Sequence, residues 1–176
     1  IEELANIPDK IREVLKLSDQ LAELARTFTY SHNFLYLGRG YNYPVALEGA
    51  LKLKEISYIH SEAYASGELK HGTISLIEEG TPVIAAATYM PLFDKAMSNV
   101  VEVQARGAHV LALTTDSGAE RMHSRVERVL TVPETETMLL PQLGVVPLQL
   151  LAYYIALERG CDIDKPRNLA KSVTVE

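Results

Sequence analysis

Four short apolar runs recur along this chain, with stretches of helical spacing among them. The runs are Asn33–Leu37, Pro82–Ala87, Val110–Leu113 and Val129–Val132. Short apolar runs bounded by turn residues are typical of buried strands. Strands that alternate with helices form βαβ units, whose parallel sheet is covered by helices on both faces. The pattern therefore predicts an α/β fold built on a parallel sheet.

The helical stretches differ in how apolar they are. Residues 1–27 carry apolar positions with charges between them, as an amphipathic helix does, and Pro8 predicts a break into two helices near that residue. A mixed helical pattern covers Leu92–Arg106, whereas Leu139–Arg159 is long and apolar and is followed by a glycine. The residues from Asp162 onward show no periodicity, and we expect them to form a tail laid over the surface.

The stretch Ala46–Gly72 carries most of the candidate chemistry. It opens as a helix that is apolar almost all round, a composition typical of buried helices. Glu48, Lys52 and Glu55 nevertheless share one face, since they are spaced by four and three residues. Charges on a buried helix must be paired, hydrated or directed into a site, because burying an unpaired charge away from water costs much free energy. The spacing fits both a helix edge with two ion pairs and a functional site, and His71 lies near the end of the stretch.

Composition restricts the class of protein. With 176 residues, 47% of them apolar and 23% charged, the chain fits one globular domain. The net charge of −6 argues against binding to nucleic acid or to an anionic membrane, which requires a basic face. The lone cysteine, Cys161, favours a reducing compartment, and we expect a cytoplasmic location. No apolar run approaches the roughly 18 residues of a membrane span, and the start at Ile1 suggests a piece of a longer protein.

Other candidate sites have weaker support. The turn Gly38–Gly40 has the first two glycines of a dinucleotide fingerprint, but Tyr43 occupies the third position. A structural turn and an anion site formed by backbone N–H groups both fit it. The five histidines are scattered, so we expect no metal site. No nucleophile elbow occurs, which favours a structural role for the Cys161 thiol, and Lys171 in a polar tail reads by itself as a solvated lysine.

Three blocks of sequence carry a specific resemblance to a known family. They are LGRGYNYPVALEGALKLKEISYIHSEAYASGELKHG, VPLQLLAYYIALERG and DIDKPRNLAKSVTVE. They closely resemble the second sugar-isomerase (SIS) domain and the C-terminal tail of the glucosamine-6-phosphate synthases, also called glutamine–fructose-6-phosphate aminotransferases (isomerising). The resemblance implies a three-layer α/β/α sandwich of flavodoxin-like type around a five-stranded parallel sheet. It also implies a SIS domain with an N-terminal helix over residues 1–160 and a catalytic tail over residues 161–176.

The resemblance also implies an activity. The family converts fructose 6-phosphate to glucosamine 6-phosphate with ammonia from glutamine, by ring opening, imine formation and proton transfer between C1 and C2, without a cofactor. The expected partners are the sugar phosphate, a second copy in a homodimer, and the glutaminase and first SIS domains of the full-length chain. SIS modules also serve as non-catalytic sugar-phosphate sensors, which is the alternative. A sensor would normally carry a helix-turn-helix, and the sequence shows no basic signature of one.

The functional residues of the family fall on matching positions here. Glu55 corresponds to the carboxylate that moves the proton between C1 and C2, and partial burial would raise its pKa toward a useful value. Lys52 corresponds to a lysine that neutralises charge beside it. His71 corresponds to a histidine from the neighbouring subunit that assists ring opening. Lys171, with Ala170 beside it, corresponds to the tail lysine that holds the open-chain sugar, for which a Schiff base would require a neutral amine.

Overall fold

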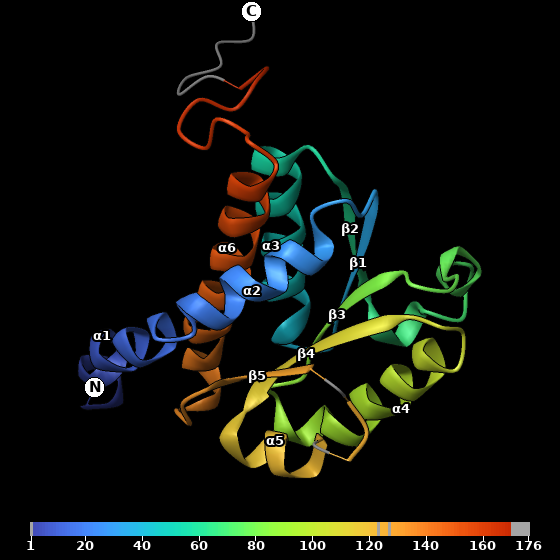
Figure 1. Cartoon of the computed structure of the whole chain (residues 1–176). Helices are drawn as coiled ribbons and strands as arrows, with labels where there is room; N and C mark the ends of the chain where they lie inside the picture. Colours follow the sequence, from blue (N-terminus) through green and yellow to red (C-terminus); the bar gives the residue numbers. More distant parts are fainter. Residues whose placement is uncertain (1, 123, 127, 170–176) are drawn as a thin grey trace, which may run out of the picture.

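A five-stranded parallel sheet forms the centre of the molecule (Figure 1). The computed structural model describes residues 2–122, 124–126 and 128–169. In spatial order the strands are β2 (His60–Ala65), β1 (Asn33–Gly38), β3 (Pro82–Ala86), β4 (His109–Thr115) and β5 (Arg128–Val132). All neighbouring strands are parallel, which confirms the expected sheet. The edge strand β2 carries polar residues, so its sequence predicts only an extended segment.

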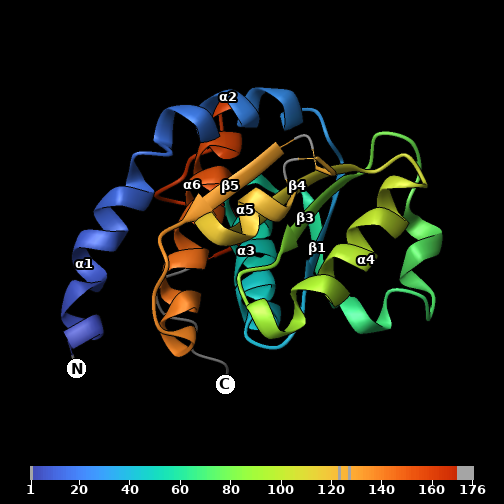
Figure 2. The same ribbon diagram turned by 90° about the horizontal axis from the view of Figure 1, so that it is seen from below.

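Helices cover both faces of this sheet (Figures 1 and 2). One face is covered by α1 (Glu2–Leu15), α2 (Ser18–Phe28), α3 (Asn42–Ser57) and α6 (Leu140–Glu158). The other is covered by α4 (Phe93–Gln104), α5 (Asp116–Met122) and the 3-10 turns η1 (Ser66–Glu68) and η2 (Thr73–Leu76). Two more 3-10 turns, η3 (Met90–Leu92) and η4 (Thr137–Leu139), precede α4 and α6. The expected three-layer sandwich is confirmed, with the flavodoxin-like strand order.

Successive side chains of a strand enter opposite cores. Along β1, Phe34 and Tyr36 belong to the core beneath α3 and α6, whereas Leu35 and Leu37 belong to the core beneath α4. Because both faces are buried, the apolar residues of such a strand form a continuous run rather than an alternating one. This requirement explains why the central strands are recognisable in the sequence.

The long helix α6 lies in the core on the α3 side of the sheet. Its length and its mean hydropathy of 1.5 over an 18-residue window would suffice for a membrane span, so the expectation that no segment approaches one is wrong for this helix. Packing accounts for its apolar residues, because Leu143, Leu148 and Leu151 are fully buried in that core. An apolar surface on all sides is the normal result when a helix is buried on several sides.

Helix α1 runs through Pro8 without a break, which contradicts the predicted division at that residue. The chain breaks instead at residues 16–17, where a turn leads into α2. Proline removes one backbone hydrogen bond from a helix. However, Ile7 and Val14 are buried on either side of this position and hold the helix against the domain. Packing of the apolar stripe therefore outweighs the local cost of proline.

Two glycines test how closely α3 and α6 pack. A Cβ atom at Gly49 would lie 2.7 Å from Leu148 Cδ1, whereas one at Gly144 would lie 3.5 Å from Val45 Cγ1, an ordinary contact. We expect Gly49→Ala to lower the free energy of unfolding by about 1–3 kcal/mol through overpacking. We expect Gly144→Ala to raise it by up to about 1 kcal/mol through helix propensity. Urea denaturation measures both, and effects of the same sign would contradict the predicted difference in packing.

Candidate functional site

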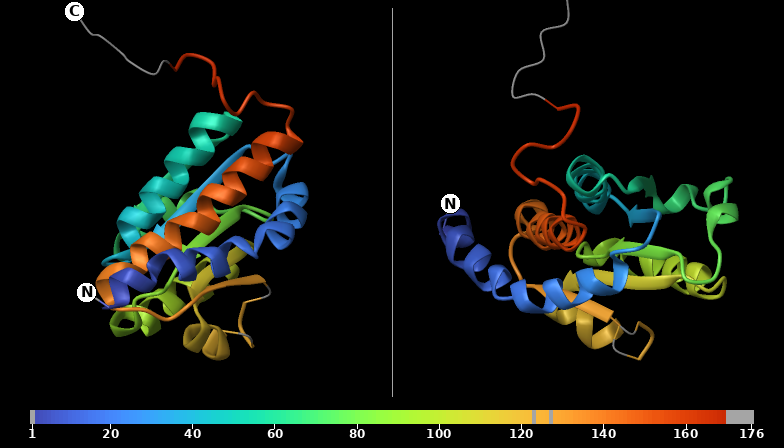
Figure 3. Two further views of the ribbon diagram at one scale, coloured as in Figure 1. Left: turned by 90° about the vertical axis from the view of Figure 1, so that its left-hand side faces the viewer. Right: turned by 45° about the horizontal axis from the view of Figure 1, so that its top comes forward.

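The C-terminal ends of α3 and α6 lie at the same edge of the sheet. Each helix follows a strand and runs back across the sheet, so its last turn returns to the edge at which the strands begin. The two helices pack along each other, and the segment after α6 passes over their ends (Figure 3). The start of the tail therefore lies at the end of the helix that carries the predicted site residues Lys52 and Glu55.

Lys52 and Glu55 form an ion pair in the second half of α3. Nζ of Lys52 lies 2.8 Å from Oε2 of Glu55 and 3.8 Å from Oε1 of Glu48. The three side chains keep between 29% and 36% of their surface exposed. The hydrogen bond to Glu55 raises the pKa of Lys52, although partial burial acts in the opposite direction. Lys52 is therefore a cation near neutral pH, and it balances a carboxylate that solvent can still reach.

The outward face of α3 is apolar but is not covered by the described residues. Leu47 and Leu51, which precede Glu55 on the same helix face by eight and four residues, are 45% and 41% exposed. Ala50 and Leu53, which face the core, are 3% and 0% exposed. The expectation of a buried helix is thus wrong for half of its circumference, because α3 packs on one side only. A molecule that covers this face would also shield Glu55 from water, which strengthens electrostatic interactions there.

His71 lies away from Glu55 within one chain. β2 ends at the edge of the sheet opposite to the end of α3, and His71 follows between η1 and η2 on the α4 side. The nearby Leu69 is fully buried in the core of that side. The imidazole is exposed, and its Nδ1 lies 2.7 Å from Oε2 of Glu68. A single chain therefore brings Lys52 and Glu55 together but leaves His71 on the other side of the sheet.

The predicted tail residues Ala170 and Lys171 lie outside the described residues. The segment that leads to them is held at the end of α3 by residues that sequence reasoning missed. Arg159 donates from Nε to a backbone oxygen at the end of α3 at 3.1 Å, and the guanidinium of Arg167 stacks on the ring of Tyr58. A basic residue at a helix end is a general signal for carbonyl contacts, but no sequence signal marks the second pairing.

The turn Gly38–Gly40 is closed by internal contacts, which favours the structural interpretation over an anion site. The N–H groups of Asn42 and Tyr43 donate back into the turn, each at 3.1 Å. Two donors that an anion would need are therefore already used. A Cβ atom at Gly38 would overlap the backbone oxygen of Asn42, so the close approach of the helix start requires glycine.

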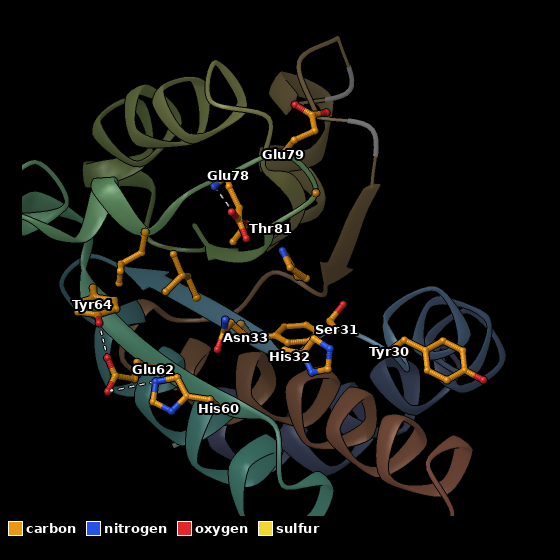
Figure 4. Close-up of a pocket in the computed structure, with 15 residues that line it drawn as sticks. Tyr30, Ser31, His32, Asn33, His60, Glu62, Tyr64, Glu78, Glu79 and Thr81 are labelled. Carbon is orange, nitrogen blue, oxygen red and sulfur yellow. Dashed lines mark hydrogen bonds and ion pairs between the residues drawn. The ribbon is translucent and has the colours of Figure 1, made fainter.

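A separate cavity of about 430 Å³ lies at the amino ends of β1, β2 and β3 (Figure 4). Neither Lys52, Glu55 nor His71 lines it. Inside it Glu62 accepts a hydrogen bond from the hydroxyl of Tyr64, and this contact raises the pKa of Tyr64 to about 12. Across the described part of the chain, no group of three or more His, Cys, Asp or Glu side chains gathers as metal ligands do.

Comparison with known proteins identifies the family. The model of the SIS domain matches residues 27–159. The chain belongs to the SIS-domain family. It is 56% identical over 176 residues to the glutamine–fructose-6-phosphate aminotransferase [isomerizing] of Bacteroides thetaiotaomicron, and 57% identical over 175 residues to the protein of that name from Clostridium acetobutylicum. These matches cover 100% and 99% of this chain but only 28% of each relative.

A solved SIS-family structure agrees with the sequence comparison. It is the C-terminal domain of glucosamine-fructose-6-phosphate aminotransferase from Francisella tularensis, with a TM-score of 0.90 and 41% identity. The match covers 94% of this chain and 47% of that chain. The resemblance inferred from the three sequence blocks is therefore confirmed, and so is the SIS fold that it implies.

The raised pKa of Lys52 predicts a pH dependence of stability. Stabilisation from such a group is fully present below the ordinary lysine pKa of 10.5 and is lost as the pH rises through the higher folded value. We expect Lys52→Met to lower the free energy of unfolding near neutral pH by at most about 1 kcal/mol, because the pair is partly exposed. That difference should shrink above pH 10.5. Urea denaturation across this range measures it, with Lys54→Met as the control because Lys54 is an exposed lysine on the same helix. A difference that grows with pH would contradict the assignment.

Proposed function

We propose that this chain is the isomerase part of a glutamine–fructose-6-phosphate aminotransferase. The complete enzyme would form glucosamine 6-phosphate from fructose 6-phosphate and ammonia released from glutamine. The observation that carries the proposal is 56–57% identity along the whole chain with relatives of that name. In this proposal residues 1–160 are the SIS domain, residues 161–176 are the catalytic tail, and the enzyme works in the cytoplasm.

The proposed reaction requires a carboxylate beside C1 and C2 of the sugar. Ammonia condenses with the C2 carbonyl of open-chain fructose 6-phosphate, and water leaves, which gives an imine. Glu55 takes a proton from C1, and the electron pair of that bond forms the C1–C2 double bond while the C2–N double bond opens and its nitrogen takes up a proton, which gives an enaminol. Glu55 then returns a proton to C2 as the C1 hydroxyl loses its proton to solvent. The product then has an aldehyde at C1 and an amine at C2. A carboxylate suits both transfers, and the Lys52 cation 2.8 Å away balances its charge.

Further roles rest on the matching positions in the family. We assign Lys171 to hold the open-chain sugar, with Ala170 beside it at the substrate, and His71 to assist ring opening near neutral pH. The raised pKa of Lys52 keeps its amine protonated, so Lys52 is unsuited to a Schiff base. This supports giving that role to Lys171. Other domains of the full-length chain would supply ammonia and bind the phosphate, and the proposed reaction uses no cofactor or metal.

Glu55→Gln tests the proton carrier in a full-length aminotransferase that contains this chain. The change keeps the reach of the side chain and removes its basicity. We therefore expect incorporation of solvent deuterium at C1 of the sugar to fall by about 10²–10⁴-fold, with little change in affinity for fructose 6-phosphate. Glu48→Gln, on the same helix face but 3.8 Å from Lys52, is the matched control and should retain nearly parental exchange.

The same measurement separates the two classes of function. A non-catalytic sugar-phosphate module would bind the sugar without exchanging its C1 proton in either protein. Normal exchange by a folded Glu55→Gln enzyme would leave Glu55 as a structural charge only.

The positions of His71 and Glu55 support a homodimeric site. If both act on one sugar, the histidine must come from a second copy, because the sheet separates them in one chain. Full-length His71→Ala and Glu55→Gln proteins should therefore complement each other. After exchange of subunits we expect up to about one quarter of parental activity, since half of the dimers are mixed and each has one intact site. Mixed dimers without recovered activity would contradict a shared site.

A further inference from the structure

The segment after α6 is attached to the end of α3 at two points. At the first, the guanidinium of Arg159 donates to the backbone oxygens of Ser57 at 3.1 Å and of Thr29 at 2.6 Å, and so joins the ends of three helices. At the second, the backbone N–H of Arg167 donates to the hydroxyl of Tyr58 at 2.9 Å, and its guanidinium carbon lies 4.1 Å from the ring centre. We call the contact between Tyr58 and Arg167 the tail clamp.

Tyr58 adopts a backbone conformation that bulky residues avoid. Its φ of 62° and ψ of 18° are left-handed, and helices that end this way usually have glycine or asparagine at that position. A tyrosine there carries a cost that either residue would reduce. In return its ring and hydroxyl meet Arg167. The unfavourable backbone conformation of Tyr58 occurs together with its contact to Arg167, and such a combination points to a function for that contact.

The tail between the two points is also ordered by local contacts. The carboxylate of Asp162 accepts hydrogen bonds from the N–H groups of Asp164 and Lys165, at 3.1 and 2.9 Å, which forms an Asx-type turn. Directly after the tail clamp, Asn168 has a φ of 62°, and the N–H of Leu169 donates to the backbone oxygen of Pro166 at 3.4 Å, which closes a turn. The direction in which the chain leaves Arg167 is therefore set by described residues on both sides of it.

We propose that Tyr58 and Arg167 are positioning residues of the sugar site, which hold the start of the segment that carries Lys171 beside Glu55. This inference rests on the proposed function. Tyr58 follows Glu55 by about one helical turn, and Lys171 follows Arg167 by four residues, a span of at most about 14 Å. Fixing one end of so short a segment limits how far the lysine can move from the end of α3, and in this proposal it raises the effective concentration of the lysine at the sugar.

The tail clamp is tested in a full-length aminotransferase that contains this chain. Tyr58→Asn removes the ring but tolerates the left-handed backbone, and Arg167→Ala removes the guanidinium. We expect each to lower kcat for glucosamine 6-phosphate formation by about tenfold or more, because the reacting groups are misplaced. KM for fructose 6-phosphate should change less, since the proposed phosphate site lies elsewhere. Tyr58→Phe keeps the stacked ring and should restore most of the activity.

Arg121→Ala is the matched control. Arg121 stacks on Phe93 at 4.2 Å in a similar way, but on the α4 and α5 side of the sheet, so its loss should leave kcat at the parental value. The double variant Tyr58→Asn/Arg167→Ala should lose no more than the more affected single variant, because both residues act through one contact. Clamp variants that match Arg121→Ala in kcat, or losses that add in the double variant, would overturn the proposal.

Glu55→Gln distinguishes failure of this proposal from failure of the proposed function. If Glu55→Gln abolishes proton exchange while the clamp variants keep parental kcat, only the positioning role is rejected. If Glu55→Gln exchanges the C1 proton normally, the proposed function is rejected, and the positioning role is rejected with it.

Discussion

Parallel strands oblige each connecting helix to run back across the sheet, and this constraint decides where the candidate chemistry lies. α3 and α6 both return to the edge at which the strands begin, so the start of the tail lies against the end of the helix that carries Glu55, despite their separation in sequence. β2 ends at the opposite edge and leads to His71 there. Open α/β sheets usually bind ligands at that opposite edge, but here the N–H groups of Asn42 and Tyr43, at the start of α3, already donate to backbone oxygens of the turn Gly38–Gly40. The charged pair is therefore the stronger candidate.

The sequence predicted those strands whose burial requires a run of apolar residues. β1, β3, β4 and β5 lie inside the sheet or carry continuous apolar runs, so short apolar segments mark them. The edge strand β2 and the seven-residue helix α5 lack such a mark, because one is partly polar and the other is too short for a periodic pattern. The prediction at Pro8 was wrong because a local cost was weighed without the packing of Ile7 and Val14 that offsets it.

The sequence predicted the part of the candidate site whose residues are close together along the chain. A spacing of three residues on a helix brings Lys52 and Glu55 together, and the structure shows that pair. Spacing cannot tell a structural pair from a functional one, because a partly exposed ion pair contributes little energy in either case. The roles of Glu55, His71 and Lys171 depend on the family resemblance. The contact of Tyr58 with Arg167 depends on two helices that end side by side, so no local pattern encodes it.

The contact between Tyr58 and Arg167 is much weaker than the fold of the domain to which it attaches the tail. One stacked pair and one hydrogen bond contribute on the order of 1–3 kcal/mol, whereas unfolding a domain costs on the order of 5–15 kcal/mol. The described part of the tail therefore detaches and rebinds many times during the lifetime of the folded sheet. Each detachment frees the side chain of Tyr58 at the end of α3 without disturbing either core. Warming should release the tail well below the temperature at which the domain melts.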